Sequence, residues 1–186
     1  VVKLFAEITI KSRPVRTRMV RMLRDNLRTL IKPIDPDIEI DRNWDYIGLT
    51  SHKDAATQAA IVDVLQRTPG ISYFQRVLEF PLYKEKTDEN AANAVDWDGI
   101  FQATKAIYAP ILTGKTFRTT CRRLGEHSFQ SGDIERYIGG GLNQTCDTGG
   151  VKLKGFDIDV KVEIRHDRFY VIEQAYPGLG GFPMAT

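Results

Sequence analysis

The segment VKLFAEITIKSRPVRTRMVRMLRDNLRTLI, residues 2–31, decides the fold because two periodicities follow each other in it. Apolar residues alternate along residues 2–10, which predicts a half-buried strand. Pro14 suits the first turn of a helix, because proline fixes φ near the helical value and lacks an N–H that would be unpaired there. The expected apolar stripe of this helix, to Ile31, consists of Val15, Met19, Met22, Leu23, Leu27 and Leu30.

The next residues complete a β-α-β-β-α-β order. Residues 38–42 and 45–51 have the pattern of two short strands joined near Asn43 and Trp44, and residues 54–67 form a second amphipathic helix. The turn sequence TPG precedes a strand at residues 71–80. This order predicts an α+β protein that begins with a ferredoxin-like domain at residues 1–80, an antiparallel sheet with two helices on one face.

A second domain follows the polar connection PLYKEKTDENAANA at residues 81–94. Asp96 is a good N-cap for a helix that ends near Pro110. Residues 114–123 predict a strand, Ser131 begins another helix, and a hairpin turns around residues 166–167. We place this α/β domain at residues 81–183, with an alternative start near residue 58.

Charge is distributed unevenly along the chain. The 186 residues carry a net charge of +2, but residues 11–32 carry eight lysines and arginines against the single acid Asp25. Such a cluster favours a polyanionic partner, although a basic helix face can also be merely solvated. No apolar run of membrane-spanning length and no signal peptide is present, which predicts a cytoplasmic protein with no membrane partner. The missing initiator Met and the ending GGFPMAT indicate a part of a longer protein.

Three consecutive glycines, residues 139–141, interrupt the helix that begins at Ser131. Each costs about 1 kcal/mol relative to alanine inside a helix, so they require a reason. A helical wheel places Gly141 on the inner face and Gly139 and Gly140 outside, where bare backbone suits close approach of a sugar-phosphate chain. A helix that bends or ends early at the glycines is the alternative. The candidate RNA-binding residues are Lys11, Arg13, Arg16, Arg21, Arg24, Arg28, Arg122, Arg123, His127, Arg136, Gly139, Gly140 and Asn143.

No residue pattern assembles a catalytic centre or a metal site. His127 has no partnered nucleophile or carboxylate that spacing can identify. Cys121 and Cys146 lack the spacing of a zinc site, which predicts buried thiols. The sequence GLGGFP at residues 178–183 lacks the GK[ST] of a phosphate-binding loop and predicts a turn. The residues alone therefore favour a binding module.

Five blocks in order along the chain, KLFAEITIKS, RTPGI, GKTFRTTCRRLGEHSF, DIERYIGGGLNQ and YPGLGGFP, resemble the bacterial tRNA 4-thiouridine synthetase family, the tRNA sulfurtransferases linked to thiamine biosynthesis. The resemblance implies a ferredoxin-like domain and a THUMP RNA-binding domain that holds the acceptor end of tRNA. In the family a PP-loop domain follows, which uses ATP and magnesium to activate a uridine of tRNA for sulfur delivered by a persulfide-carrying cysteine desulfurase.

The resemblance assigns no catalytic residue, cofactor or metal to this chain, because the SGGxDS nucleotide loop of the family would begin soon after Thr186. Neither cysteine corresponds to the family's sulfur-handling cysteines. Two alternatives stay open: the THUMP portion of another tRNA-modifying enzyme, such as a methyltransferase, and a ferredoxin-like module that binds a small regulatory molecule. The sequence predicts no oligomeric state.

Overall fold

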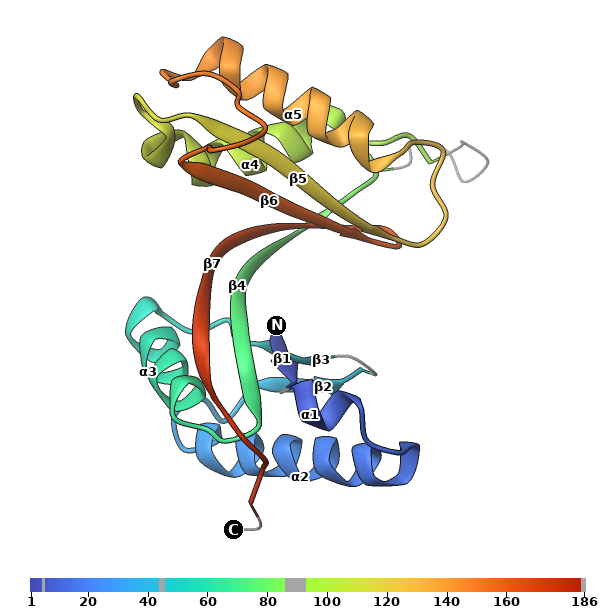
Figure 1. The fold of residues 1–186 in the computed structure, drawn as a ribbon, viewed down its shortest axis with the longest axis vertical. Coiled ribbons are helices and arrows are strands. Elements are labelled where there is room, and N and C mark those ends of the chain that lie inside the picture. The colour runs from blue at the N-terminus through green and yellow to red at the C-terminus, as the bar shows by residue number, and fades with distance from the viewer. Residues whose placement is uncertain (5, 44–45, 86–92, 185–186) are drawn as a thin grey trace. The chain divides into compact units, whose positions relative to one another are not determined.

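A computed structural model describes residues 1–4, 6–43, 46–85 and 93–184 (Figure 1). The chain forms two compact units, residues 1–76 with 174–186 and residues 77–173. The fold class is α+β, as predicted: helices accompany a mixed sheet with the strand order β2-β3-β1-β4-β7-β6-β5. The long strands β4 and β7 contribute residues to both units.

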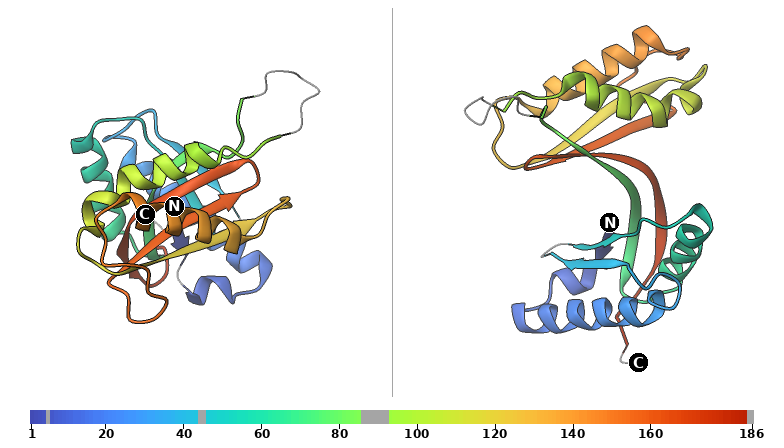
Figure 2. Two further views of the ribbon diagram at one scale, coloured as in Figure 1. Left: turned by 90° about the horizontal axis from the view of Figure 1, so that it is seen from above. Right: turned by 180° about the vertical axis from the view of Figure 1, so that it is seen from behind.

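The first unit has the predicted ferredoxin-like topology. Its elements are β1 (Val2–Leu4), α1 (Ala6–Thr9), α2 (Arg13–Ile31), β2 (Glu39–Arg42), β3 (Tyr46–Thr50), α3 (Ala55–Gln66) and β4 (Ile71–Pro81). β1 lies between β3 and β4 and is antiparallel to both. α2 lies beside the short strands β2 and β3 and contacts α3 (Figure 2). The predicted junction near Trp44 falls outside the described residues.

The predicted strand at residues 2–10 is wrong beyond Leu4, because the chain turns there into the short helix α1. This turn buries Ile8 completely but leaves Ile10 78% exposed, so the two residues do not share one face as a strand would require. The carbonyl of Thr9 accepts a hydrogen bond from Arg16 Nη1 at 3.2 Å, which ties the end of α1 to α2. Alternating apolar residues therefore did not distinguish a strand from a short helix here.

Helix α2 begins one residue before Pro14 and ends at Ile31, close to the predicted bounds. Its buried face is rotated from the predicted stripe: Val20 and Ile31 are buried, whereas Val15 and Leu30 are 41% and 45% exposed. Arg16 is only 8% exposed. The aliphatic part of its side chain covers the core at a position where an apolar residue was expected, and its guanidinium binds the Thr9 carbonyl.

The second unit consists of the end of β4, α4 (Trp97–Leu112), β5 (Phe117–Leu124), α5 (Ser131–Thr145), β6 (Ile158–Arg165) and the first half of β7 (Arg168–Gly180). β5 and β6 are parallel, and β6 and β7 form the predicted hairpin, in which His166 has a φ of 53°. α4 continues past its predicted end, since Pro110 lies within its last turn. Of the expected connection at residues 81–94, residues 86–92 lie outside the described part.

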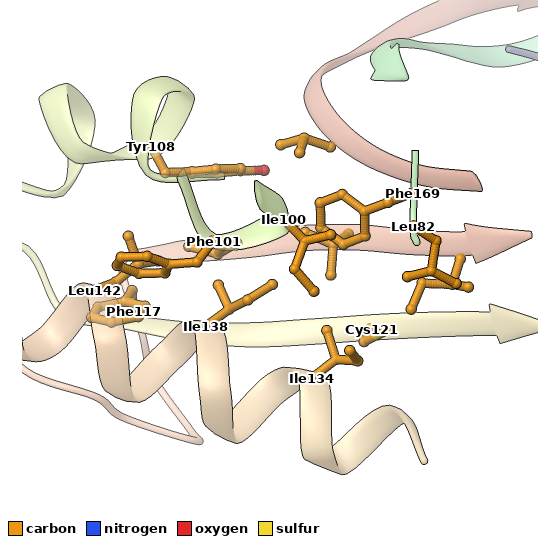
Figure 3. Packing of buried hydrophobic residues seen from close by; sticks show 14 of the residues in the cluster. Leu82, Ile100, Phe101, Tyr108, Phe117, Cys121, Ile134, Ile138, Leu142 and Phe169 are labelled. Atoms are coloured by element: carbon orange, nitrogen blue, oxygen red, sulfur yellow. The ribbon is translucent and has the colours of Figure 1, made fainter. Parts of the chain in front are cut away.

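Both helices of this unit cover the same face of the strands, and the core lies between the helices and the strands. Figure 3 shows Ile134, Ile138 and Leu142 of α5 directed at β5, with Phe101 and Tyr108 supplied by α4. The Tyr108 hydroxyl donates to the Ile172 carbonyl at 2.6 Å, so even the polar tip of this core residue is satisfied.

The segment after residue 173 packs in the first unit, a feature that the sequence boundaries did not include. The Gly70 amide donates to the Gly180 carbonyl at 2.8 Å, and the rings of Phe74 and Tyr176 stack 5.0 Å apart. The expected turn at residues 178–183 is in part strand, because β7 continues to Gly180 before Gly181 turns with a φ of 72°.

Candidate nucleic-acid interface

The outer face of α2 presents arginines that outnumber the acids of the helix. Arg18, Arg21 and Arg28 are exposed, and ten residues of helix span about 15 Å. The only acid of this segment, Asp25, binds Arg24 at 2.6 Å. Like charges three or four residues apart destabilise a helix by roughly 0.2–0.5 kcal/mol per pair, so this face carries a penalty that a bound polyanion would relieve.

A concave surface of about 430 Å³ lies at the N-terminal end of α2. Its lining consists of Arg13, Arg16, Thr17, Val20, Arg42 and Asn43. Arg16 is only 8% exposed, so this predicted contact residue is chiefly a wall of the groove. Sequence reasoning missed Arg42, because a single arginine at the end of a short strand gives no local signal. Lys11 is exposed near this end, with its ammonium 5.5 Å from the Phe182 ring centroid.

The predicted RNA-binding residue Arg122 does not share a face of β5 with the glycine-containing helix α5. Successive side chains of a strand point to opposite faces. Thr119 faces α5, because its Oγ1 would lie 3.1 Å from a β-carbon placed on Gly139. Arg122 therefore projects from the face that the helices leave uncovered. There Arg118 Nη2 and Thr120 Oγ1 each donate to Asp159 at 2.8 Å.

Arg123 and His127 bind each other and the neighbouring backbone. Arg123 Nη1 donates to the Gly125 carbonyl at 3.0 Å and lies 3.1 Å from His127 Nδ1. His127 Nε2 lies 2.6 Å from the His166 carbonyl, which only accepts hydrogen bonds. The bonds thus favour the tautomer with its hydrogen on Nε2. Any contact of these two residues with RNA would compete with bonds that shape their loop.

The three glycines have three different surroundings. Gly139 is buried beside Thr119, so its predicted place on the outer face is wrong. A β-carbon on Gly141 would lie 2.5 Å from Phe101 Cε2, which confirms that this glycine allows close packing inside. A β-carbon on Gly140 would have no atom within 4 Å. Gly140 alone keeps the open surroundings that contact with a partner requires.

A hollow of about 370 Å³ opens in front of Gly140. Phe101, Arg136, Tyr137, Gly141 and Gln144 complete its lining. Arg136 is exposed and binds Asp133 at 2.5 Å. Asn143 is not among the lining residues and accepts a hydrogen bond from Thr148 Oγ1 at 3.0 Å. Tyr137 was not among the predicted residues, because an aromatic residue in a helix is more often part of the core.

The acids near this helix have structural partners. Asp133 accepts from the Gln130 amide at 2.8 Å, which lowers the pKa of its carboxyl, and Glu135 accepts from the Cys121 amide at 2.8 Å.

Within the described ranges no three His, Cys, Asp or Glu side chains are arranged to hold a metal. No described helix is long and apolar enough to cross a membrane.

The two thiols should differ in reactivity. Burial, and then the negative charge of Glu135, raise the pKa of Cys121 to about 12, whereas Cys146 is partly exposed. Because the thiolate is the reactive form, iodoacetamide at pH 8 should label Cys146 in the folded protein and reach Cys121 only after denaturation. Peptide mass spectrometry can compare the two sites. Rapid labelling of Cys121 in the native chain would show that this thiol is accessible and ionised.

The comparison with family models agrees with the two-part architecture. The ThiI ferredoxin-like domain matches residues 1–74, and the THUMP domain matches residues 94–172. The tRNA sulfurtransferase of Pseudomonas aeruginosa strain LESB58 is 40% identical over 187 aligned residues, and that of Aeromonas salmonicida strain A449 is 41% identical over 186. Each alignment covers the whole chain but only 36% of the relative, so the chain spans about a third of their length.

Solved structures share the fold at lower identity. The protein PH1313 from Pyrococcus horikoshii aligns with a TM-score of 0.75 and 22% identity over 98% of this chain and 56% of its own. A 4-thiouridine synthetase, solved as an RNA complex with bound ATP, aligns with a TM-score of 0.72 and 16% identity over 98% of this chain and 42% of its own. The chain consists of a ThiI ferredoxin-like domain and a THUMP domain, and along its whole length it is similar to part of the tRNA sulfurtransferases.

Proposed function

We propose that this domain pair binds tRNA for an ATP-dependent tRNA uracil 4-sulfurtransferase and holds its acceptor end. The observation that carries the proposal is the exposed arginine face of α2, with Arg18, Arg21 and Arg28, on a chain whose full length aligns with tRNA sulfurtransferases. Phosphate contacts by lysine and arginine supply most of the sequence-independent affinity for nucleic acid. A ferredoxin-like regulatory module would not need such a face.

The chemistry of the proposed enzyme belongs to sequence outside these 186 residues. They contain no SGGxDS nucleotide loop, so we assign the binding of ATP and magnesium to the remainder of the protein. The buried, un-ionised Cys121 is also unsuited to carry a persulfide. We assign ATP activation, sulfur transfer from a cysteine desulfurase, and the link to thiamine biosynthesis to a full-length cytoplasmic protein, with binding and orientation of the tRNA assigned to this chain.

This assignment predicts that the chain binds tRNA without modifying it. Incubation of the 186-residue chain with tRNA, ATP, magnesium and a persulfide donor should give a tRNA complex in a gel-shift assay but no 4-thiouridine. Mass spectrometry of the digested nucleosides measures the product, and a full-length tRNA sulfurtransferase under the same conditions is the positive control. Formation of 4-thiouridine by the chain alone would refute this assignment.

A further inference from the structure

Strand β7 separates from β6 partway along its length. Their pairing starts at the two-residue hairpin loop and ends at Val162 and Val171, so Lys161 and Ile172 would form the next pair. In an antiparallel ladder, pairs that exchange two backbone hydrogen bonds alternate with pairs that exchange none. Counted from the hydrogen-bonded pair that closes the hairpin loop, Lys161 and Ile172 take the next position at which the two backbones would bond each other.

The hydroxyl of Tyr108 occupies that position instead. The Lys161 amide donates to the hydroxyl oxygen at 3.2 Å, and the hydroxyl donates to the Ile172 carbonyl at 2.6 Å. Tyr108 belongs to α4 and is only 4% exposed, and Figure 3 shows its hydroxyl directed away from the helix. One side-chain oxygen therefore connects an amide and a carbonyl that a continued ladder would join directly.

A tyrosine hydroxyl suits this bridge because it accepts and donates at the same time. Burial raises the pKa of Tyr108 above its usual range, so the group keeps the proton that it donates. A buried backbone amide or carbonyl without a partner is costly, and loss of the hydroxyl would leave one of each. The bridge therefore holds both strands at the point where they separate.

The bridge lies directly before the place where β7 passes from one unit to the other. Residue 173 is the last residue of the second unit, and the following residues of β7 belong to the first. Tyr108, Lys161 and Ile172 all belong to the second unit. Because Tyr108 bonds to Ile172, it holds the last part of β7 that is still within the second unit.

We propose that Tyr108 is a positioning residue, whose hydroxyl fixes where β7 separates from β6 and so restricts motion of the first unit relative to the second. Hinges between domains consist of a few residues at the ends of elements, which absorb the change of backbone angles. Without the hydroxyl, the end of β7 would lose its bond to α4 and more of the strand would take part in the hinge. With it, the hinge starts after Ile172.

Tyr108→Phe keeps the ring and removes the bridge. The Lys161 amide should then exchange its hydrogen about tenfold faster relative to other core amides, the change that corresponds to the loss of one internal hydrogen bond. Residual dipolar couplings of backbone amides measure how strongly each unit is aligned. The ratio of the weaker to the stronger alignment should fall in this variant, because the two units move more freely relative to each other.

Thr104→Val is the matched control. Thr104 is also fully buried on α4, but its hydroxyl donates within the helix, to the Ile100 carbonyl at 2.8 Å. The control should leave both the Lys161 exchange and the alignment ratio as in the unchanged chain. In the unchanged chain itself, NMR should detect a slowly exchanging hydroxyl proton on Tyr108, which tests the bridge without any substitution.

Three results would overturn the proposal. The first is a Tyr108→Phe protein with the Lys161 exchange of the unchanged chain, or a Tyr108 hydroxyl proton that exchanges too fast to detect. The second is faster exchange with an unchanged alignment ratio, which would make Tyr108 a stabilising residue only. The third is an equal fall of the ratio in Thr104→Val. Neither readout involves RNA, so the outcome is independent of the proposed function.

Discussion

Gly141→Ala should be less stable than Gly140→Ala by about 1–3 kcal/mol, the usual range for overpacking a core. Both substitutions gain the same helix propensity, about 1 kcal/mol, so their difference isolates the side-chain clash. The added methyl at residue 141 would lie 2.5 Å from the ring of Phe101, which is only 8% exposed, whereas that at residue 140 meets nothing within 4 Å. Calorimetry of both variants measures the difference.

Affinity for tRNA should show the opposite order in the same two variants. Gly140→Ala should fold with equal or slightly higher stability and bind tRNA more weakly, because its methyl occupies the floor of the hollow lined by Arg136 and Tyr137. Gly139→Ala should have a stability between those of the other two variants, since its methyl would lie 3.1 Å from the rotatable hydroxyl of Thr119. A Gly140→Ala protein that melts lower and binds normally would make this glycine structural and end the RNA-contact explanation.

Replacement of Arg21 and Arg28 by glutamine should reduce the salt dependence of tRNA binding without loss of stability. Each phosphate that an arginine no longer neutralises lowers the slope of log affinity against log salt by about 0.9 for duplex-like RNA, so the slope of the double variant should fall by about 1.8. Glutamine has nearly the helix propensity of arginine, and the change relieves repulsion along α2, so the melting temperature should stay or rise. Filter binding at several salt concentrations gives the slope.

The charge-matched control for this experiment is Lys53→Gln/Arg67→Gln. Both residues lie in the same unit and are 40% and 72% exposed, but each is paired with an acid, Asp37 and Asp63 respectively. Exposed pairs of this kind contribute about 0–1 kcal/mol, so the control should fold normally. Equal reductions of slope in the two double variants would mean that the arginine face of α2 has no special role and that only total charge matters.

Sequence periodicity was sufficient for most of the fold because most elements are long and have turn signals at their ends. Asp54 and Asp96 cap α3 and α4 through side-chain bonds to Thr57 and Gly99, as helix-start rules predict. The rules failed at residues 6–10, where one helical turn is too short for its period to differ from that of a strand. The rules could not assign the residues after 173 to the first unit, because that assignment depends on the pairing of β7 with β4, which is distant in sequence.

The candidate site was less predictable than the fold because it depends on which way each side chain points. A helical wheel placed Gly140 correctly but put Gly139 outside, since a rotation by a fraction of a turn decides between Thr119 and solvent. Arg122 and Arg123 are adjacent in sequence and project to opposite faces of β5.

The most direct test of the central claim is the affinity of the unchanged 186-residue chain for folded tRNA, measured by fluorescence anisotropy over a series of salt concentrations. We expect binding that weakens linearly on a log-log plot as salt increases, with similar affinity for several tRNAs, because arginines on α2 contact phosphates rather than bases. Absence of tRNA binding at low salt, or an affinity independent of salt, would contradict it.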